Sequence, residues 1–158
     1  MVRLSEPNFT TKPKVNEVAE DKLDKVGPIM NEIGVEAAAI VGGDPNGLFV
    51  YGELDDGVVY AAVFKDFGNE VRYFDFSDEL AELLRDAWEA EPDRNLRWVA
   101  IEYEVNGTSF HVKLRYPEEF KLDEDASDRR EAALKRRYGD KPIIYPPISD
   151  DFIELRRD

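Results

Sequence analysis

The chain has 158 residues, of which 42% are hydrophobic and 35% are charged. Its 35 Asp and Glu outnumber its 21 Lys and Arg, which gives a formal net charge of -14. Such a negative surface repels nucleic acids and anionic membranes and favours basic partners. The absence of cysteine excludes disulfides, thiolate catalysis and cysteine-based zinc sites. The length predicts one domain with a sizeable core.

The N-terminal residues mix Pro, Asn and Thr without periodicity, so we expect a flexible arm over 1–13 and a single domain over 14–158. The opening residues contain no apolar run that could form the core of a signal peptide. No segment approaches the ~18 apolar residues that a membrane span needs. We therefore expect a cytoplasmic protein.

The first helix is predicted by apolar residues that recur with helical spacing from Asn16 to Ile33. Gly27 and Pro28 should interrupt this helix, because proline lacks the N–H that the preceding turn needs. Gly34 is expected to end it.

Four strands are expected next, separated by turn signals. The segment 35–41, VEAAAIV, is almost uniformly apolar, which is typical of a strand covered on both faces. The other three are expected at 48–54, 58–65 and 70–76, with turns at DPNG (44–47), DDG (55–57) and DFGN (66–69).

A second helix is expected over 77–89, with Ser77 as its N-cap. Its apolar residues follow the spacing of one buried stripe: Leu80, Leu83, Leu84, Ala87 and Trp88. Two strands, 96–105 and 108–114, flank Asn106-Gly107, a pair typical of a type I′ hairpin turn. The expected core includes Leu80, Leu84, Trp88, Val99, Ile101, Phe110 and Val112.

The last helix is expected from about Ser127 to Tyr138, ended by Gly139 and followed by an extended Pro-rich segment. The order of elements predicts an α+β fold: an antiparallel β-sheet of about six strands with helices packed on one face.

No catalytic, metal or cofactor site is predicted. His111 is the only histidine and has no evident second ligand or nucleophile. Asp55-Asp56-Gly57 lacks the alternating ligands and the terminal Glu of a calcium loop. Glu102 and Glu104 share one strand face, but paired carboxylates catalyse only in a pocket that separates their pKa values. We expect them to face solvent.

The second helix carries four acidic residues opposite its apolar stripe, Asp78, Glu82, Asp86 and Glu89, with Arg85 the one positive member. Like charges at this spacing repel. They form either a solvated face or a surface for a basic partner. The turn residues Asp55 and Asp56 are further candidates for partner binding.

The segment DASDRREAALKRRYGDKPIIYPP (125–147) holds six of the 21 Lys and Arg: Arg129, Arg130, Lys135, Arg136, Arg137 and Lys141. On an acidic protein, Arg129 and Arg130 are expected to pair with carboxylates of the same molecule. We interpret this basic run as an internal clip that docks the last helix and packs Ile143 to Tyr145 against the sheet.

Several features of 36–147 together resemble the YezG-type immunity protein family. They are the Leu-rich helix ending in Trp88, the Trp98 strand, the hairpin with Phe110, Tyr116-Pro117 and the closing RREAALKRRYGDKPIIYPP. These small bacterial proteins are encoded beside polymorphic toxins, many of them nucleases. The resemblance implies a non-enzymatic antitoxin that binds and blocks the C-terminal domain of its cognate toxin.

Two alternatives remain. The chain could be a small-ligand-binding domain or an enzyme whose acidic site is assembled only in the fold, which would show as a deep pocket lined by perturbed carboxylates. Its acidity could instead reflect a saline habitat without any partner.

Overall fold

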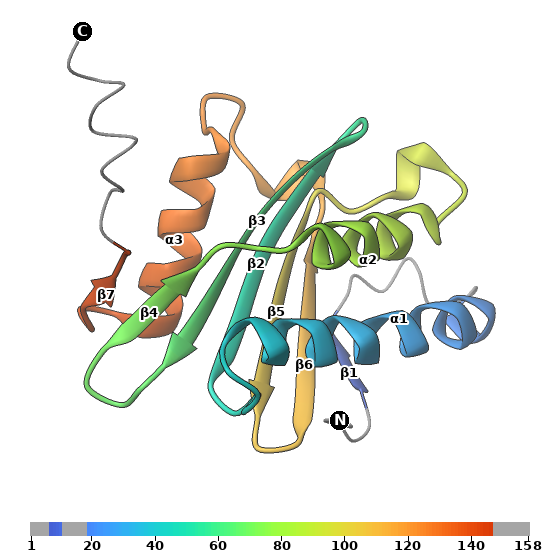
Figure 1. Cartoon of the computed structure of the whole chain (residues 1–158). Coiled ribbons are helices and arrows are strands. Elements are labelled where there is room, and N and C mark those ends of the chain that lie inside the picture. Colours follow the sequence, from blue (N-terminus) through green and yellow to red (C-terminus); the bar gives the residue numbers. More distant parts are fainter. Residues whose placement is uncertain (1–6, 11–18, 147–158) are drawn as a thin grey trace, which may run out of the picture.

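The computed structural model describes residues 7–10 and 19–146, and these form one seven-stranded sheet with three helices (Figure 1). The strands are β1 (Pro7–Thr10), β2 (Leu48–Asp55), β3 (Val58–Asp66), β4 (Val71–Phe74), β5 (Ala100–Asn106), β6 (Ser109–Arg115) and β7 (Ile143–Ile144). The helices are α1 (Ala19–Ile40), α2 (Asp78–Glu89) and α3 (Ala126–Tyr138), with 3-10 turns η2 (Arg94–Leu96) and η3 (Pro117–Glu119).

The strand order is β1-β6-β5-β2-β3-β4-β7. All pairs are antiparallel except the two at the edges, β1 with β6 and β4 with β7, which are parallel. The predicted α+β class and the mostly antiparallel sheet are therefore confirmed.

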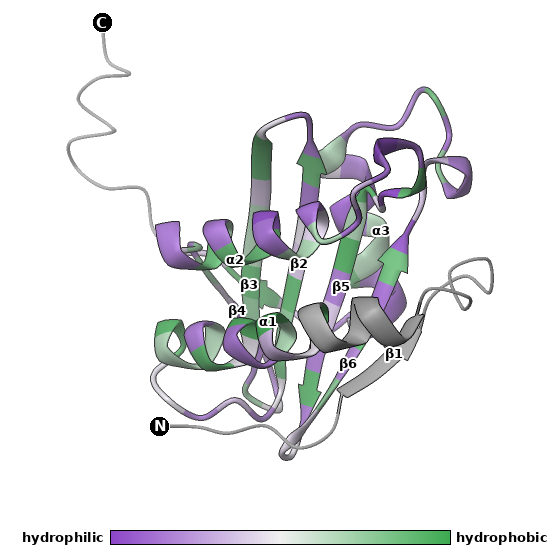
Figure 2. Ribbon diagram, turned by 90° about the vertical axis from the view of Figure 1, so that its right-hand side faces the viewer, coloured by the Kyte–Doolittle hydropathy of each residue, from purple (hydrophilic) through white to green (hydrophobic). Residues whose placement is uncertain are grey.

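The helices cover both faces of the sheet, so the expectation of helices on one face is wrong for the last one. Helices α1 and α2 lie together on one face, and α3 lies on the other (Figures 1 and 2). Along β2, Leu48 and Val50 enter the α1–α2 core, whereas Phe49 and Tyr51 enter the core beneath α3. Seven consecutive residues of β2 are buried, which requires cover on both sides.

Helix α1 is longer than predicted and continues through Pro28 to Ile40. The expected break at Gly27 and Pro28, the end at Gly34 and the strand over 35–41 are therefore wrong. A short apolar run fits a buried helix as well as a buried strand, and alanine is the strongest helix former. Ala37 and Ala38 continue the buried stripe of Ile33, and that burial offsets the cost of Pro28 on the exposed side.

Helix α2 packs on β2 at Gly52, a position that requires glycine. A Cβ there would lie 3.1 Å from Ile101 Cγ2 and 3.3 Å from Leu84 Cδ1. The absence of a side chain lets the helix approach the sheet. The predicted N-cap is confirmed, because Ser77 Oγ accepts from Leu80 N–H at 3.1 Å. Of the expected core residues, Trp88 and Val99 are half-buried, and the other five are fully buried.

Two hairpins follow the expected pairing, but their turn types differ from expectation. The β5–β6 hairpin closes over Gly107-Thr108, and only Gly107 has positive φ, as in a type II′ turn. Both Asp56 and Gly57 have positive φ in the β2–β3 turn, so the type I′ turn lies there. The hydrogen bond from Gly107 N–H to Asn46 Oδ1, at 2.7 Å, ties the first turn to the loop before β2.

The two ends of the described chain form the sheet edges. Residues 7–10 pair with β6, so this part of the expected arm is a strand, and the other residues of 1–13 lie outside the described residues. At the opposite edge, Val71 N–H donates to the Pro142 carbonyl at 2.9 Å, and β7 pairs with β4. The expected packing of the segment after Gly139 along the sheet is confirmed for the residues up to 146.

We predict that Leu84→Ala lowers the free energy of unfolding by about 2–5 kcal/mol, because Leu84 is fully buried where α2 meets Gly52. Chemical denaturation measures this loss. A loss below about 0.5 kcal/mol, the size typical of surface positions, would contradict the assigned packing face.

Candidate functional site

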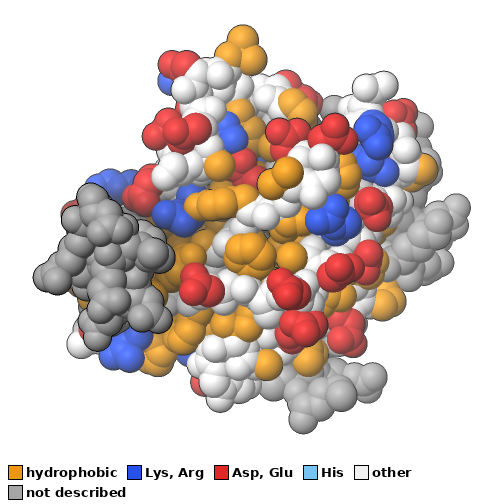
Figure 3. Space-filling view, turned by 45° about the horizontal axis from the view of Figure 1, so that its top comes forward, with side chains coloured by type: hydrophobic (Ala, Val, Ile, Leu, Met, Phe, Trp, Pro, Cys, Tyr) orange, Lys and Arg blue, Asp and Glu red, His pale blue; other side chains and the backbone are white. Residues whose placement is uncertain are grey.

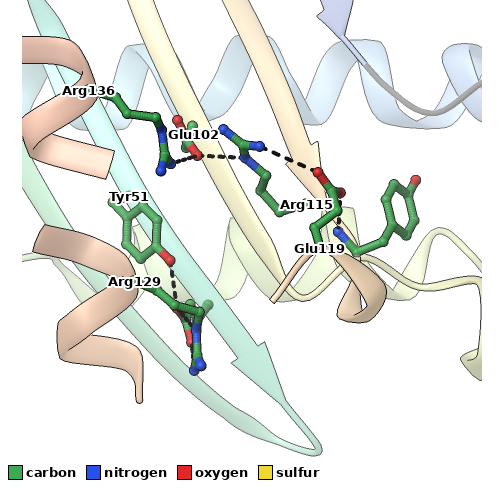
Figure 4. Close-up of polar contacts among 8 residues, drawn as sticks. Tyr51, Glu102, Arg115, Glu119, Arg129 and Arg136 are labelled. Carbon is green, nitrogen blue, oxygen red and sulfur yellow. Dashed lines mark hydrogen bonds and ion pairs between the residues drawn. The ribbon is translucent and has the colours of Figure 1, made fainter. Parts of the chain in front are cut away.

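The basic run of α3 faces a row of carboxylates on the central strands. The closest pair joins Arg129 to Glu53 of β2, with Nε to Oε2 and Nη2 to Oε1 both at 2.8 Å (Figure 4). Tyr51 Oη donates to Glu53 Oε2 at 2.6 Å. The Glu53 side chain is 8% exposed and that of Arg129 17%. A buried carboxylate is thus held by a bidentate guanidinium and a phenol, the arrangement that makes such burial tolerable.

The pKa shifts around Glu53 follow from this geometry. Burial, followed by the hydrogen bond to Glu53, raises the pKa of Tyr51 far above its ordinary value. The hydrogen bond with Glu53 also raises the pKa of Arg129, against the effect of burial. Arg129 Nη1 donates further to the Glu124 carbonyl at 2.7 Å, just before α3. Both groups therefore stay in the protonation states that hold α3 on the sheet.

A second set of ion pairs lies on β5 and β6. Glu102 Oε2 accepts from Arg115 Nε at 2.9 Å and from Arg136 Nη2 at 3.1 Å (Figure 4). Arg137 Nη1 donates to Glu104. Glu102 and Glu104 therefore do not face open solvent as expected. The sheet face that carries them is the one that α3 covers, and the arginines of α3 neutralise them.

The C-terminal end of the clip is tied by Lys141, whose Nζ lies 3.0 Å from Asp66 Oδ2. Burial alone would raise the pKa of Asp66. Hydrogen bonds from Gly68 N–H and Lys141 outweigh this effect and lower it. Asp66 thus stays ionised, so the ion pair that fixes the start of the Pro-rich segment is present at neutral pH.

The clip interpretation is confirmed for Arg129 but is wrong in its detail for Arg130. The Arg130 guanidinium lies 5.7 Å from the centre of the Tyr60 ring and has no carboxylate partner among the described residues. Sequence reasoning also missed Glu53, the anchor of the clip. A single carboxylate inside the buried strand LFVYGEL was the signal, because a buried charge needs a partner elsewhere in the chain.

The acidic residues of α2 remain exposed. Asp78, Glu82, Asp86 and Glu89 have no ion-pair partner among the side chains that the structure describes, and the neighbouring Glu79 is also exposed. Figure 3 shows acidic side chains spread over this face with few basic ones between them. The face differs from that under α3, where the carboxylates are paired.

Arg85 and Arg94 bring the second group of candidate residues next to α2. Arg85 Nη1 donates to the Gly57 carbonyl at 3.1 Å, and Arg94 Nη1 lies 3.3 Å from Asp56 Oδ1. The β2–β3 turn is thereby fixed beside α2, and it leaves Asp55 exposed. The four α2 acids, Asp55 and Asp56 form one surface, which we call the acidic surface.

The buried charged groups of the described chain are Glu53, Lys65 and Glu91. Lys65 Nζ donates to the Asp44 and Asn46 carbonyls and fixes the loop before β2. Glu91 also interacts within the chain. His111 is half-buried on β6, opposite Glu104 in register. Within 7–10 and 19–146, no cluster of three or more metal-ligating side chains occurs.

The helices in the described part of the chain include none that is long and apolar enough to cross a membrane.

Comparison with protein-family models and with the sequences of curated proteins finds no match to this chain.

We predict that Arg129→Gln destabilises the protein by about 3–5 kcal/mol, because it leaves Glu53 buried without its cation. Lys135→Gln is the matched control on the same helix. Lys135 pairs with Asp140 at side-chain exposures of 73% and 97%, so its loss should cost at most about 0.5 kcal/mol. Equal losses for the two variants in chemical denaturation would show that the clip depends on its apolar contacts.

Proposed function

We propose that the protein is a non-catalytic immunity protein that binds and blocks a basic toxin domain through the acidic surface. The observation that carries this proposal is the unequal treatment of carboxylates on the two faces of the sheet. Those under α3 are neutralised by arginines of the same chain, whereas those of α2 are exposed and unpaired. The net charge of -14 therefore acts mainly outward, away from α3.

The physical advantage of such a surface is rapid capture. A toxin that acts on nucleic acid carries a basic active face, and complementary charge raises the rate at which the two proteins meet. Exposed carboxylates on a rigid helix reach the partner without rearrangement. The β2–β3 turn is likewise held in place by Arg85 and Arg94. An acidic inhibitor of this kind needs no nucleophile, metal or pocket.

The competing proposal, an enzyme or a small-ligand-binding domain, lacks comparable support. Its site would need a charged group held ready for a substrate. Each of the buried charged residues Glu53, Lys65 and Glu91 instead interacts within the chain. The sequence resemblance to YezG-type immunity proteins points in the same direction as the acidic surface. It makes the cognate toxin C-terminal domain, with nucleases as one class, the partner that we propose in the cytoplasm of the producing cell.

We predict that neutralising Asp78, Glu82, Asp86 and Glu89 to Asn or Gln slows association with the toxin domain encoded next to this gene. The fold should be retained, because these side chains are exposed. Long-range attraction is screened beyond about 8 Å at physiological salt, so the association rate of the wild type should fall steeply as salt rises. The salt dependence of the variant should be weaker.

The matched control neutralises four exposed carboxylates elsewhere: Asp75, Asp123, Glu131 and Asp140. It changes the net charge equally, so only the position of the charge differs. Stopped-flow or surface-based kinetics compares the three proteins. Equal effects of the two sets would mean that net charge alone steers binding. Wild-type kinetics for the α2 variant would remove α2 from the interface.

A further inference from the structure

Arg130 is the exception within the basic run, and its surroundings point to a missing partner. Arg129, Lys135, Arg136, Arg137 and Lys141 each pair with a carboxylate of the described chain. The Nε atom of Arg130 is buried without an acceptor. A guanidinium that has lost part of its hydration and gained no counter-ion benefits more from an added carboxylate than a fully hydrated one does.

Three tyrosines surround this guanidinium. Its carbon lies 5.7 Å from the Tyr60 ring centre, and the rings of Tyr73 and Tyr145 lie 5.2 Å apart. Burial and a hydrogen bond to Asp75 raise the pKa of Tyr73 to about 12, and the positive charge of Arg130 opposes this rise. Arg130 likewise opposes the rise that burial causes in the pKa of Tyr145. One cation thus acts on phenols from β3, β4 and the segment after β7.

We propose that Arg130 and these three tyrosines form a binding site for a carboxylate of the same chain, supplied by Asp150 or Asp151. Both aspartates lie outside the described residues. They follow Tyr145 by five and six positions, and a chain of that length reaches at most about 20 Å. Because Tyr145 is itself part of the cluster, the site lies within reach.

A tethered carboxylate fits this site better than a free anion does. Two exposed carboxylates border the cluster: Asp75 accepts the hydrogen bond of Tyr73, and Glu131 adds to the raised pKa of Tyr145. Their charge weakens the capture of an anion from solution. A short tether supplies an effective concentration in the millimolar range, which compensates for weak intrinsic affinity. The terminal Nη atoms of Arg130 provide the paired donors that a carboxylate accepts.

The test compares amide hydrogen exchange and thermal unfolding of four full-length proteins: the wild type, Arg130→Gln, Asp150→Asn/Asp151→Asn, and the three changes combined. In the wild type, amides of 149–152 should exchange more slowly than in Arg130→Gln. Each of the first two variants should lower the thermal midpoint by about 2–4 °C, and the combined variant by no more than either. Lys135→Gln, on the same helix, should leave exchange at 149–152 unchanged.

Two results would overturn the proposal. Additive midpoint shifts, or no difference in exchange at 149–152 between wild type and Arg130→Gln, would show that the aspartates do not contact Arg130. Loss of toxin-domain binding in Arg130→Gln together with unchanged exchange would assign the carboxylate to the partner. The aspartate variant changes no residue of the described core, so the test remains decisive if Arg130→Gln folds poorly.

Discussion

The ion pair between Glu53 and Arg129 determines how the two halves of the molecule are joined. Glu53 occupies the central strand β2, where it is 6% exposed, and a carboxylate buried there is unfavourable unless a cation meets it. Arg129 meets it with a two-bond fork, and this contact fixes the position of α3 over the sheet. Few apolar side chains of α3 are buried, Ala133 and Leu134 among them. Charge pairing therefore supplies much of the register that packing supplies for α2.

This arrangement gives the two faces of the sheet different electrostatic characters. Under α3, positive and negative groups alternate and cancel locally. On the other side, α2 presents unpaired carboxylates, and Arg85, its one cation, donates to the β2–β3 turn. The same acidic composition thus stabilises one face and leaves the other negatively charged. The proposed antitoxin role follows from the second face and requires none of the ion pairs of the first.

Periodicity predicted the elements whose burial is one-sided. The stripe of α2 and the alternation of β5 and β6 were readable because each has one polar face. Residues 35–40 were not, because an alanine-rich run without polar alternation fits either buried structure. The side of α3 was also unreadable, since its position depends on Glu53, 76 residues earlier in the chain. The exposure of the α2 acids followed from the apolar stripe, whereas their proximity to Asp55 and Asp56 depended on the long-range contacts of Arg85 and Arg94.

The division of charge between the two faces can be tested most directly by the hydrogen-exchange footprint of the protein bound to the toxin domain encoded next to its gene. Exchange reports on every backbone amide of both faces in one experiment. The account predicts slower exchange in α2 and at 55–58 on binding, with exchange in α3 unchanged. Protection of α3 with no change in α2 would contradict it, because the internally neutralised face would then be the binding surface.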